Sequence, residues 1–370
     1  MPSKVVLVVP TYNYLSYPIV EKLGAIKHDD TELVCLEFYQ PRADFGPFPE
    51  TTLFSRVQRI HPDTTKPGIL EMRYLRRRLI NYLEYLNPQC IITFSDVTFF
   101  ARCVKGTRFE SLLLIIQPCL LSAQPPTPVK RVIYGIGRLL NKIFACPIYR
   151  ERHYWGELLN QASYCIWSNV EEKTRKVAGK IRHCGNFFFD LPDVVFPLED
   201  TDRVLVLVPD LPYYGKSELE LLVASFSRLL WAWPSITFEF KYHPRNVDRL
   251  PLSDHANYQE LSNFSIPDVA RYDMIVSAYS NLAVTLRCLH PKVIIFDLGW
   301  YADSGIPYLG PEFFRIPKSG DSLLEHFMAL KEESRAVEAN DYLSTLFSIS
   351  PGFAECIEEY FSAPKGLGES

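Results

Sequence analysis

Residues 4–9 read Lys-Val-Val-Leu-Val-Val, and residues 203–208 read Arg-Val-Leu-Val-Leu-Val. Each stretch is a short and nearly continuous run of β-branched and aliphatic residues, which is typical of a strand buried on both faces of a parallel sheet. One run opens the chain and the other lies just past its midpoint. Because a chain of 370 residues usually forms about two domains, each run is expected to begin one of them.

Helical patterns alternate with further strand patterns after each run. In the first half, the sequence predicts a helix over residues 72–86 and a strand over residues 90–94. In the second half, it predicts a helix over residues 218–231, a strand over residues 237–242 and a helix over residues 282–288. Strands that alternate with helices indicate βαβ units and a parallel sheet, so the fold class is α/β with two Rossmann-like domains.

The expected boundaries follow from this pattern. Residues 1–190 are expected to form an N-terminal Rossmann-like domain, and residues 203–335 a second Rossmann-like domain. Residues 187–202 contain two prolines and weak periodicity, which is typical of a linker. Residues 336–370 are expected to form C-terminal helices that pack back on the N-terminal domain.

Composition narrows the class of protein. Lys+Arg number 39 and Asp+Glu number 43, so the formal net charge is −4 and a general nucleic-acid partner is not expected. Hydrophobic residues make up 47% of the chain, which is ample for a large core. The apolar run at the start is too short for a signal peptide, and no stretch is long enough to span a membrane. A cytoplasmic protein is therefore expected.

The pattern of cysteines also favours a cytoplasmic protein. The nine residues are scattered, odd in number and without a CxxC pair, and most lie in apolar strand-like runs. Buried reduced thiols are the expected state.

Three polar clusters follow predicted strands of the second half, and the first contains His243. Lys241, His243, Pro244 and Arg245 lie at the end of a β-rich run. His243 can donate to a phosphate oxygen, and Pro244 fixes the chain direction beyond it. Lys241 and Arg245 can neutralise a diphosphate or a sugar carboxylate. The alternative is a solvated strand end whose histidine caps neighbouring backbone.

The second cluster contains Ser277, Tyr279, Ser280 and Asn281, at the end of one strand and the start of the next helix. Hydroxyl groups and free N–H groups at a helix start can cradle a phosphate. The alternative is ordinary N-capping by Ser280 with no ligand.

The third cluster, residues 296–301, carries an aromatic pair that could flank a nucleobase or sugar, or form a core corner. In a parallel sheet the carboxyl ends of all strands lie at one edge, so the three clusters are expected to meet there. Their joint placement favours a nucleotide-binding edge.

This order of motifs resembles a known group of enzymes. A strand followed by Lys-x-His-Pro-Arg, a strand followed by Ser-x-x-Ser at a helix start, and a strand followed by Trp-Tyr are similar to the donor domain of bacterial surface-polysaccharide transferases with a GT-B architecture. That group includes capsule-type 3-deoxy-manno-octulosonic acid (Kdo) transferases, bacterial sialyltransferases and CDP-polyol phosphotransferases. Residues 183–190 resemble the Gly-Asn-Pro-x-x-Asp turn of these proteins, and the whole resemblance covers roughly residues 160–305.

The resemblance implies a GT-B-like chain, with two Rossmann-like domains facing a central cleft. The first, residues 1–190, would be on the acceptor side, and the second, residues 203–335, would bind the nucleotide sugar. It also implies that His243, Ser277, Ser280 and Asn281 bind the phosphate of a CMP- or CDP-linked donor. The sequence departs from the group at two places: Thr285 and Arg287 occupy the helix where many relatives have an acidic residue, and Phe187 replaces the proline after Gly-Asn. The first departure affects the residues that would recognise the ribose or the base. The second affects only the conformation of the turn.

The expected reaction releases the donor phosphate, so the site must stabilise negative charge. His243 and Lys241 could do this without a metal. An acceptor hydroxyl needs a general base. Asp96, which follows a predicted strand, is the first candidate for this catalytic role, and the alternative is that it caps the following helix. Weaker candidates for the base are Glu37 and Asp44, and Tyr12, Asn13 and Tyr14 could line the acceptor side.

Residues 130–152 combine an apolar helical stripe with basic flanks. Such a helix could lie on the anionic inner membrane, where a lipid-linked acceptor would be found. The alternative is a helix that faces the core and has a solvated basic side.

The sequence therefore predicts a metal-independent glycosyltransferase of surface-polysaccharide, capsule or lipopolysaccharide synthesis. It would move Kdo or a sialic-acid-like sugar from a CMP-linked donor to a glycan or lipid-linked glycan, with no other cofactor. The alternatives are a CDP-polyol phosphotransferase, a UDP-sugar 2-epimerase and a non-catalytic sugar-nucleotide-binding assembly protein. The epimerase is less favoured because residues 280–286 lack the Gly-Gly and paired Glu that such enzymes usually have.

Overall fold

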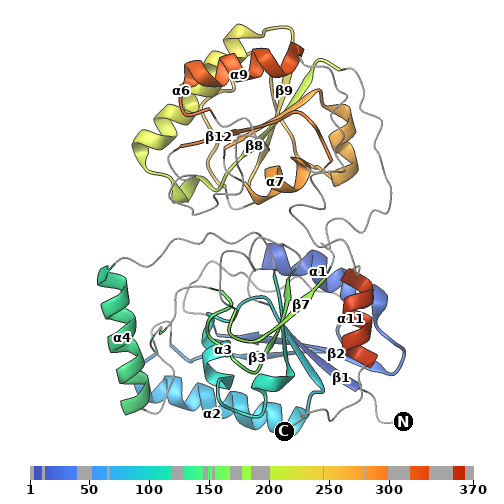
Figure 1. The fold of residues 1–370 in the computed structure, drawn as a ribbon, viewed down its shortest axis with the longest axis vertical. Coiled ribbons are helices and arrows are strands. Elements are labelled where there is room, and N and C mark those ends of the chain that lie inside the picture. The colour runs from blue at the N-terminus through green and yellow to red at the C-terminus, as the bar shows by residue number, and fades with distance from the viewer. Residues whose placement is uncertain are drawn as a thin grey trace. The chain divides into compact units, whose positions relative to one another are not determined.

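The structure is a computed structural model, and its chain divides into two compact units (Figure 1). Unit 1 comprises Met1–Asp190 and Phe347–Ser370, and unit 2 comprises Leu191–Leu346. The structure describes residues 4–10, 13–39, 52–64, 67–117, 128–144, 149, 151, 155–166, 177–184, 201–244, 246–278, 280–287, 289–298, 317–332 and 353–362. The linker expected over residues 187–202 lies almost wholly outside them.

Unit 1 contains a seven-stranded sheet in the order β3-β2-β1-β4-β5-β6-β7, with every pairing parallel. Its strands are β1 (Lys4–Val9), β2 (Thr31–Phe38), β3 (Arg56–Ile60), β4 (Cys90–Thr93), β5 (Leu113–Ile116), β6 (Ser163–Ile166) and β7 (Lys180–His183). Its helices are α1 (Asn13–Ile26), α2 (Ile69–Leu86), α3 (Phe99–Val104), the 3-10 turn η1 (Glu110–Leu112), α4 (Pro128–Ile143) and α11 (Phe353–Ser362).

Both faces of this sheet are covered by helices (Figure 1). Alternate residues of β1 and β2, such as Leu7 and Val34, pack with α2 residues in one core cluster. α1 lies on the other face, and α11 packs against it. Burial on both faces explains why the central strands read as continuous apolar runs.

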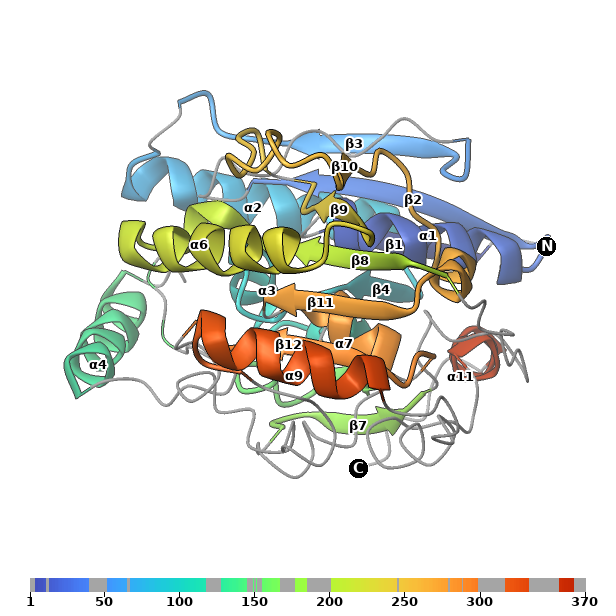
Figure 2. The same cartoon turned by 90° about the horizontal axis from the view of Figure 1, so that it is seen from above.

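Unit 2 contains a five-stranded parallel sheet in the order β10-β9-β8-β11-β12. Its strands are β8 (Arg203–Val208), β9 (Thr237–Tyr242), β10 (Tyr258–Glu260), β11 (Met274–Ala278) and β12 (Val293–Phe296). Its helices are α6 (Lys216–Ala232), α7 (Asn281–Arg287), α9 (Gly320–Glu332) and the 3-10 turns η3 (Leu211–Tyr213) and η4 (Ile266–Arg271). α6 and α9 lie side by side on one face of the sheet, and α7 lies on the other (Figures 1 and 2).

The sequence predictions of α/β class and parallel sheets are confirmed. β1, β8 and β9 have the predicted bounds, whereas α2 begins at Ile69, three residues before the predicted start. The sequence missed the edge strands β3 and β10, because a strand with only one neighbour keeps exposed and polar residues and has no continuous apolar run.

The prediction of reduced cysteines needs one correction. Cys35, Cys90, Cys103 and Cys356 are buried thiols, as expected, but Cys165 and Cys184 form a disulfide. β6 and β7 are adjacent and parallel, so their carboxyl ends bring the two Cα atoms to 6.0 Å, which suits a disulfide.

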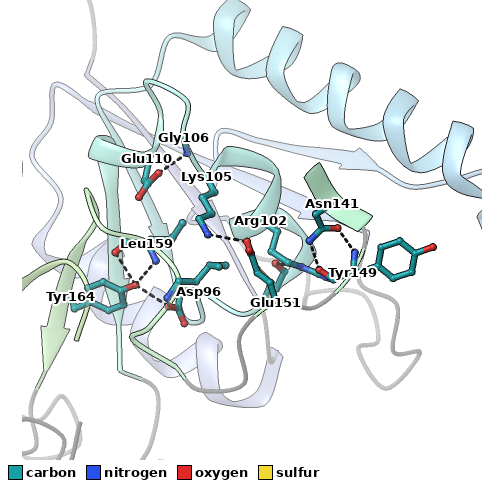
Figure 3. Close-up of polar contacts among 12 residues, drawn as sticks. Asp96, Arg102, Lys105, Gly106, Glu110, Asn141, Tyr149, Glu151, Leu159 and Tyr164 are labelled. Atoms are coloured by element: carbon teal, nitrogen blue, oxygen red, sulfur yellow. Dashed lines mark hydrogen bonds and ion pairs between the residues drawn. The ribbon is translucent and has the colours of Figure 1, made fainter. Parts of the chain in front are cut away.

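Asp96 joins three parts of unit 1 (Figure 3). It lies just after β4, and its carboxylate accepts hydrogen bonds from the backbone N–H groups of Gly156 at 3.0 Å and Leu158 at 2.9 Å, and from the Tyr164 hydroxyl at 2.9 Å. Trp155 reinforces this junction by donating to the carbonyl of Phe94 at 3.2 Å. Asp96 is therefore a connector between the end of β4, residues 155–159 and β6.

Burial makes this carboxylate sensitive to pH. Asp96 is completely buried, and loss of solvent raises its pKa from 3.8 to about 6, against the opposing effect of its three donors. Because the pKa is higher in the folded state, the folded protein binds more protons between these two values. The stability contributed by Asp96 is then full below pH 3.8 and is lost as the pH rises through about 6.

We predict that this loss is visible when wild type is compared with Asp96→Asn, whose side chain does not titrate. The free energy of unfolding of wild type, relative to the variant, should fall by about 2 kcal/mol between pH 4 and pH 6. Urea unfolding at a series of pH values measures this difference. Tyr164→Phe removes one donor to the carboxylate and should move the fall to higher pH. A difference that is constant, or that grows as the pH rises, contradicts this assignment.

Candidate active site at the carboxyl edge of the unit 2 sheet

The strand order of unit 2 reverses at β8. From β8 the chain moves to β9 on one side, and it later returns to β11 on the other side. The two connections leave in opposite directions, so the loops after β8 and β11 diverge, and ligands of open α/β sheets bind in the crevice at this point. The loops that follow Val208 and Ala278 therefore mark the place to look for a site.

His243 lies at this edge, directly after β9. Its backbone N–H donates to the carbonyl of Val208, the last residue of β8, at 3.1 Å, which fixes the histidine beside the crevice. Its Nδ1 is 3.9 Å from Oδ2 of Asp210, and its side chain remains 24% exposed. His243 is thus held in place by the sheet and still reachable from solvent, as a ligand-binding histidine must be.

Asn246 ties the loop after β9 to the loop after β8. Its Oδ1 accepts from the N–H of Leu211 at 2.9 Å, and its Nδ2 donates to the carbonyl of Pro209 at 2.7 Å. Its own backbone N–H donates to the carbonyl of His243 at 2.9 Å, and the side chain is buried. These bonds set the spacing between His243 and Asp210.

Lys241 is the last residue but one of β9 and lies opposite Leu207 of β8 in the sheet register. Partial burial lowers its pKa. Pro244 lies in the turn after His243. Arg245 and Tyr279 fall outside the described residues.

Acidic side chains also gather at this edge. Asp297 follows β12 and is buried, and Asp210 follows β8. Burial raises the pKa of the Tyr214 hydroxyl, and the negative charges of Glu218, Asp210 and Asp297 raise it further. The phenol therefore remains protonated and can donate a hydrogen bond.

The serine cluster divides into two kinds of residue. Ser277 is completely buried, and its hydroxyl donates to the carbonyl oxygens of Leu207, at 3.3 Å, and Ala278. Ser280 is partly exposed, and its Oγ accepts from the N–H of Leu282 at 3.2 Å. Ser280 thus caps α7. Of the two serines, Ser280 is accessible to a ligand and the buried Ser277 is not. Asn281 begins α7, and its side chain is not described.

The predicted acceptor-side residues are not brought together in the described part of unit 1. Asp96 is buried as described above, and Thr98, not Asp96, caps α3, by accepting from the N–H of Ala101. Glu37 lies in β2 and pairs with Arg59 of β3 at 2.6 Å. Tyr12, Asp44 and the side chains of Asn13 and Tyr14 lie outside the described residues.

Asp210 and Asn246 are residues of the edge that sequence reasoning missed. Asp210 follows the predicted strand over residues 203–208 by two positions, so the same rule that selected His243 would have found it. Asn246 carried no such signal, because its role depends on contacts with the loop after a different strand. Within the described residues, no group of three or more His, Cys, Asp or Glu side chains could hold a metal ion. None of the described helices could span a membrane.

Comparison with known proteins shows the fold. No protein family and no curated protein matches the sequence. Among solved structures, the glycotransferase of kitacinnamycin is similar, with 11% identity, a TM-score of 0.55 and coverage of 97% of this chain and 99% of the other. The glycosyltransferase SnogD from Streptomyces nogalater has 12% identity, a TM-score of 0.53 and coverage of 98% and 100%.

The UDP-GlcNAc 2-epimerase from Neisseria meningitidis, bound to UDP-GlcNAc, is similar to the same degree. It has 14% identity, a TM-score of 0.52 and coverage of 97% of this chain and 99% of the other. The likeness thus extends over almost the whole of each chain, to transferases and epimerases alike. The chain has the GT-B-like α/β fold that these enzymes share, as the sequence predicted.

Proposed function

We propose that this chain is a sugar-nucleotide enzyme, and specifically a glycosyltransferase whose donor binds at the carboxyl edge of the unit 2 sheet. The observation that carries the proposal is His243, held beside Asp210 where the strand order reverses at β8. The GT-B-like fold supports it, because glycosyltransferases share that fold with UDP-sugar epimerases.

The proposed chemistry assigns leaving-group stabilisation to unit 2. The bond between the anomeric carbon and the donor phosphate breaks, and the phosphate takes the electron pair and negative charge. A protonated His243 would donate to a phosphate oxygen, and Lys241 would add a second positive charge. The acceptor oxygen bonds to the anomeric carbon, and its proton passes to a base. Because Asp96 is buried and already accepts from three donors, we assign it the structural role and not that of the base.

The sequence and the similar structures favour different donor nucleotides. The sequence resemblance favours a CMP-linked donor with Kdo or a sialic-acid-like sugar, and a glycan or lipid-linked glycan as acceptor. Among the similar structures, the Neisseria enzyme is bound to UDP-GlcNAc, and an S. aureus protein is described as a co-structure with UDP. The first experiment should therefore determine whether the protein binds a cytidine or a uridine nucleotide.

A UDP-sugar 2-epimerase is the second candidate. It is favoured by the similarity to three solved UDP-GlcNAc or UDP-N-acetylglucosamine 2-epimerases, at TM-scores of 0.51–0.52. The two candidates predict different products from the same substrate. A transferase releases the nucleotide only when an acceptor receives the sugar, whereas an epimerase inverts the configuration at C2 with no acceptor. Analysis of purified protein incubated with a nucleotide sugar, with and without acceptor, separates them.

We predict that a nucleotide stabilises the protein through His243. Thermal unfolding with CMP, CDP, UMP and UDP should show a higher midpoint with at least one of them. His243→Ala should weaken binding of that nucleotide by about 2 kcal/mol, or about thirtyfold, because a hydrogen bond to a charged group is lost. His255→Ala is the matched control: His255 bonds to the Ser227 hydroxyl at 2.9 Å and precedes β10, at the amino edge of the sheet. The proposal fails if none of the nucleotides binds, or if the two variants weaken binding equally.

We also predict that Asn246 positions His243 for binding. Asn246→Ala removes both side-chain bonds between the two loops, so nucleotide affinity should fall by about tenfold although His243 is still present. Asn257→Ala provides the comparison, because Asn257 donates to the carbonyls of Leu230 and Trp233 near the end of α6. Both variants should unfold more easily, but calorimetric titration should find weaker binding in Asn246→Ala alone. Equal affinities would show that Asn246 acts on stability only.

A further inference from the structure

α4 exposes a row of large apolar side chains. Val129, Val132, Ile133, Ile136, Leu139 and Ile143 are each 53–69% exposed. They recur at spacings of three and four, so they share one side of the helix. The sequence alone left open whether this stripe faces the core, and the exposures show that it does not.

A different side of the same helix attaches α4 to unit 1. Gly137 is buried. The Asn141 side chain donates to the carbonyl of Tyr149 at 2.7 Å and accepts from its N–H at 2.8 Å (Figure 3). Arg73 of α2 donates to the carbonyl of Phe144 just past the helix. These contacts leave the apolar side turned away from the body of the unit.

The charge of this segment is opposite to that of the chain as a whole. Between Glu110 and Glu151 the sequence contains five basic residues and no acidic one, although the net charge of the chain is −4. Arg131, Arg138 and Lys142 are exposed and share another side of α4, which the helical period places roughly 140° around the helix from the centre of the apolar stripe. A helix with an apolar side and a separate cationic side fits the boundary between an apolar layer and an anionic one.

We propose that α4 docks unit 1 on the surface of an anionic lipid bilayer. The apolar side would lie among the acyl chains, and the cations would meet the headgroup phosphates. With 16 residues, α4 is about 24 Å long and carries charges along its length, so it lies in the interface and does not span. A second copy of the chain fits less well, because it would carry the same basic segment and offer no acidic residue between Glu110 and Glu151 to pair with it. The proposal stands on α4 alone and is independent of the proposed enzymatic function.

The test is sedimentation of the full chain with phosphatidylcholine vesicles that do or do not contain phosphatidylglycerol. Wild type should bind the anionic vesicles and not the neutral ones, and added salt should weaken binding. Ile136→Asp, and separately the triple change Arg131→Glu, Arg138→Glu and Lys142→Glu, should each reduce binding by about tenfold or more. Leu70→Asp is the matched control, because Leu70 is an apolar residue of α2 that is 79% exposed and lies outside α4.

The variants should keep the circular dichroism spectrum, melting midpoint and nucleotide affinity of wild type, which separates this test from that of the proposed function. Failure of wild type to bind anionic vesicles overturns the proposal. So does loss of binding in Leu70→Asp to the same extent as in Ile136→Asp. A concentration-dependent dimer that Ile136→Asp converts to monomer, without vesicle binding, would assign the stripe to a second copy and would equally overturn it.

Discussion

Every strand pairing in the two sheets is parallel, and the site depends on this constraint. Parallel strands require crossover connections, so all carboxyl ends within a sheet lie at one edge and the loops that follow them meet there. In unit 2 this brings Asp210, His243 and Ser280, which are far apart in sequence, to the ends of three neighbouring strands. Asn246 then fixes the position of the His243 loop, because its side chain bonds to the loop that carries Asp210.

The two units share a strand topology, but the acidic residue after a central strand has a different role in each. In both sheets the strand order reverses at the first strand, β1 or β8, and an acidic residue follows a central strand. Asp96 of unit 1 is completely buried and accepts from three donors, so its carboxyl group connects parts of the fold. Asp210 of unit 2 faces a partly exposed histidine, so its charge acts on a group that a ligand can reach. Burial, and not the position along the strand, separates the structural carboxylate from the one at the candidate site.

Sequence patterns predicted the structure correctly where a local run of residues determines it. β1, β8 and β9 have apolar runs that stand out from their surroundings, and their bounds were predicted to the residue. The location of His243 after β9 followed from the same reasoning. Patterns were insufficient where partners come from distant parts of the chain. The burial of Ser277 against β8, the three donors to Asp96 and the pairing of Cys165 with Cys184 all depend on which strands are neighbours. Hydroxyl groups near a strand end look alike in sequence, but only packing shows which of them is already bonded to the sheet.

The most direct test of the central claim is a crystal structure of the protein with the nucleotide that stabilises it most. We predict density for the nucleotide phosphate at the carboxyl edge of the unit 2 sheet, within hydrogen-bond distance of His243 and next to the loops after β8 and β11. A nucleotide bound at another place in the chain, with His243 and Asp210 facing only solvent, would contradict the account.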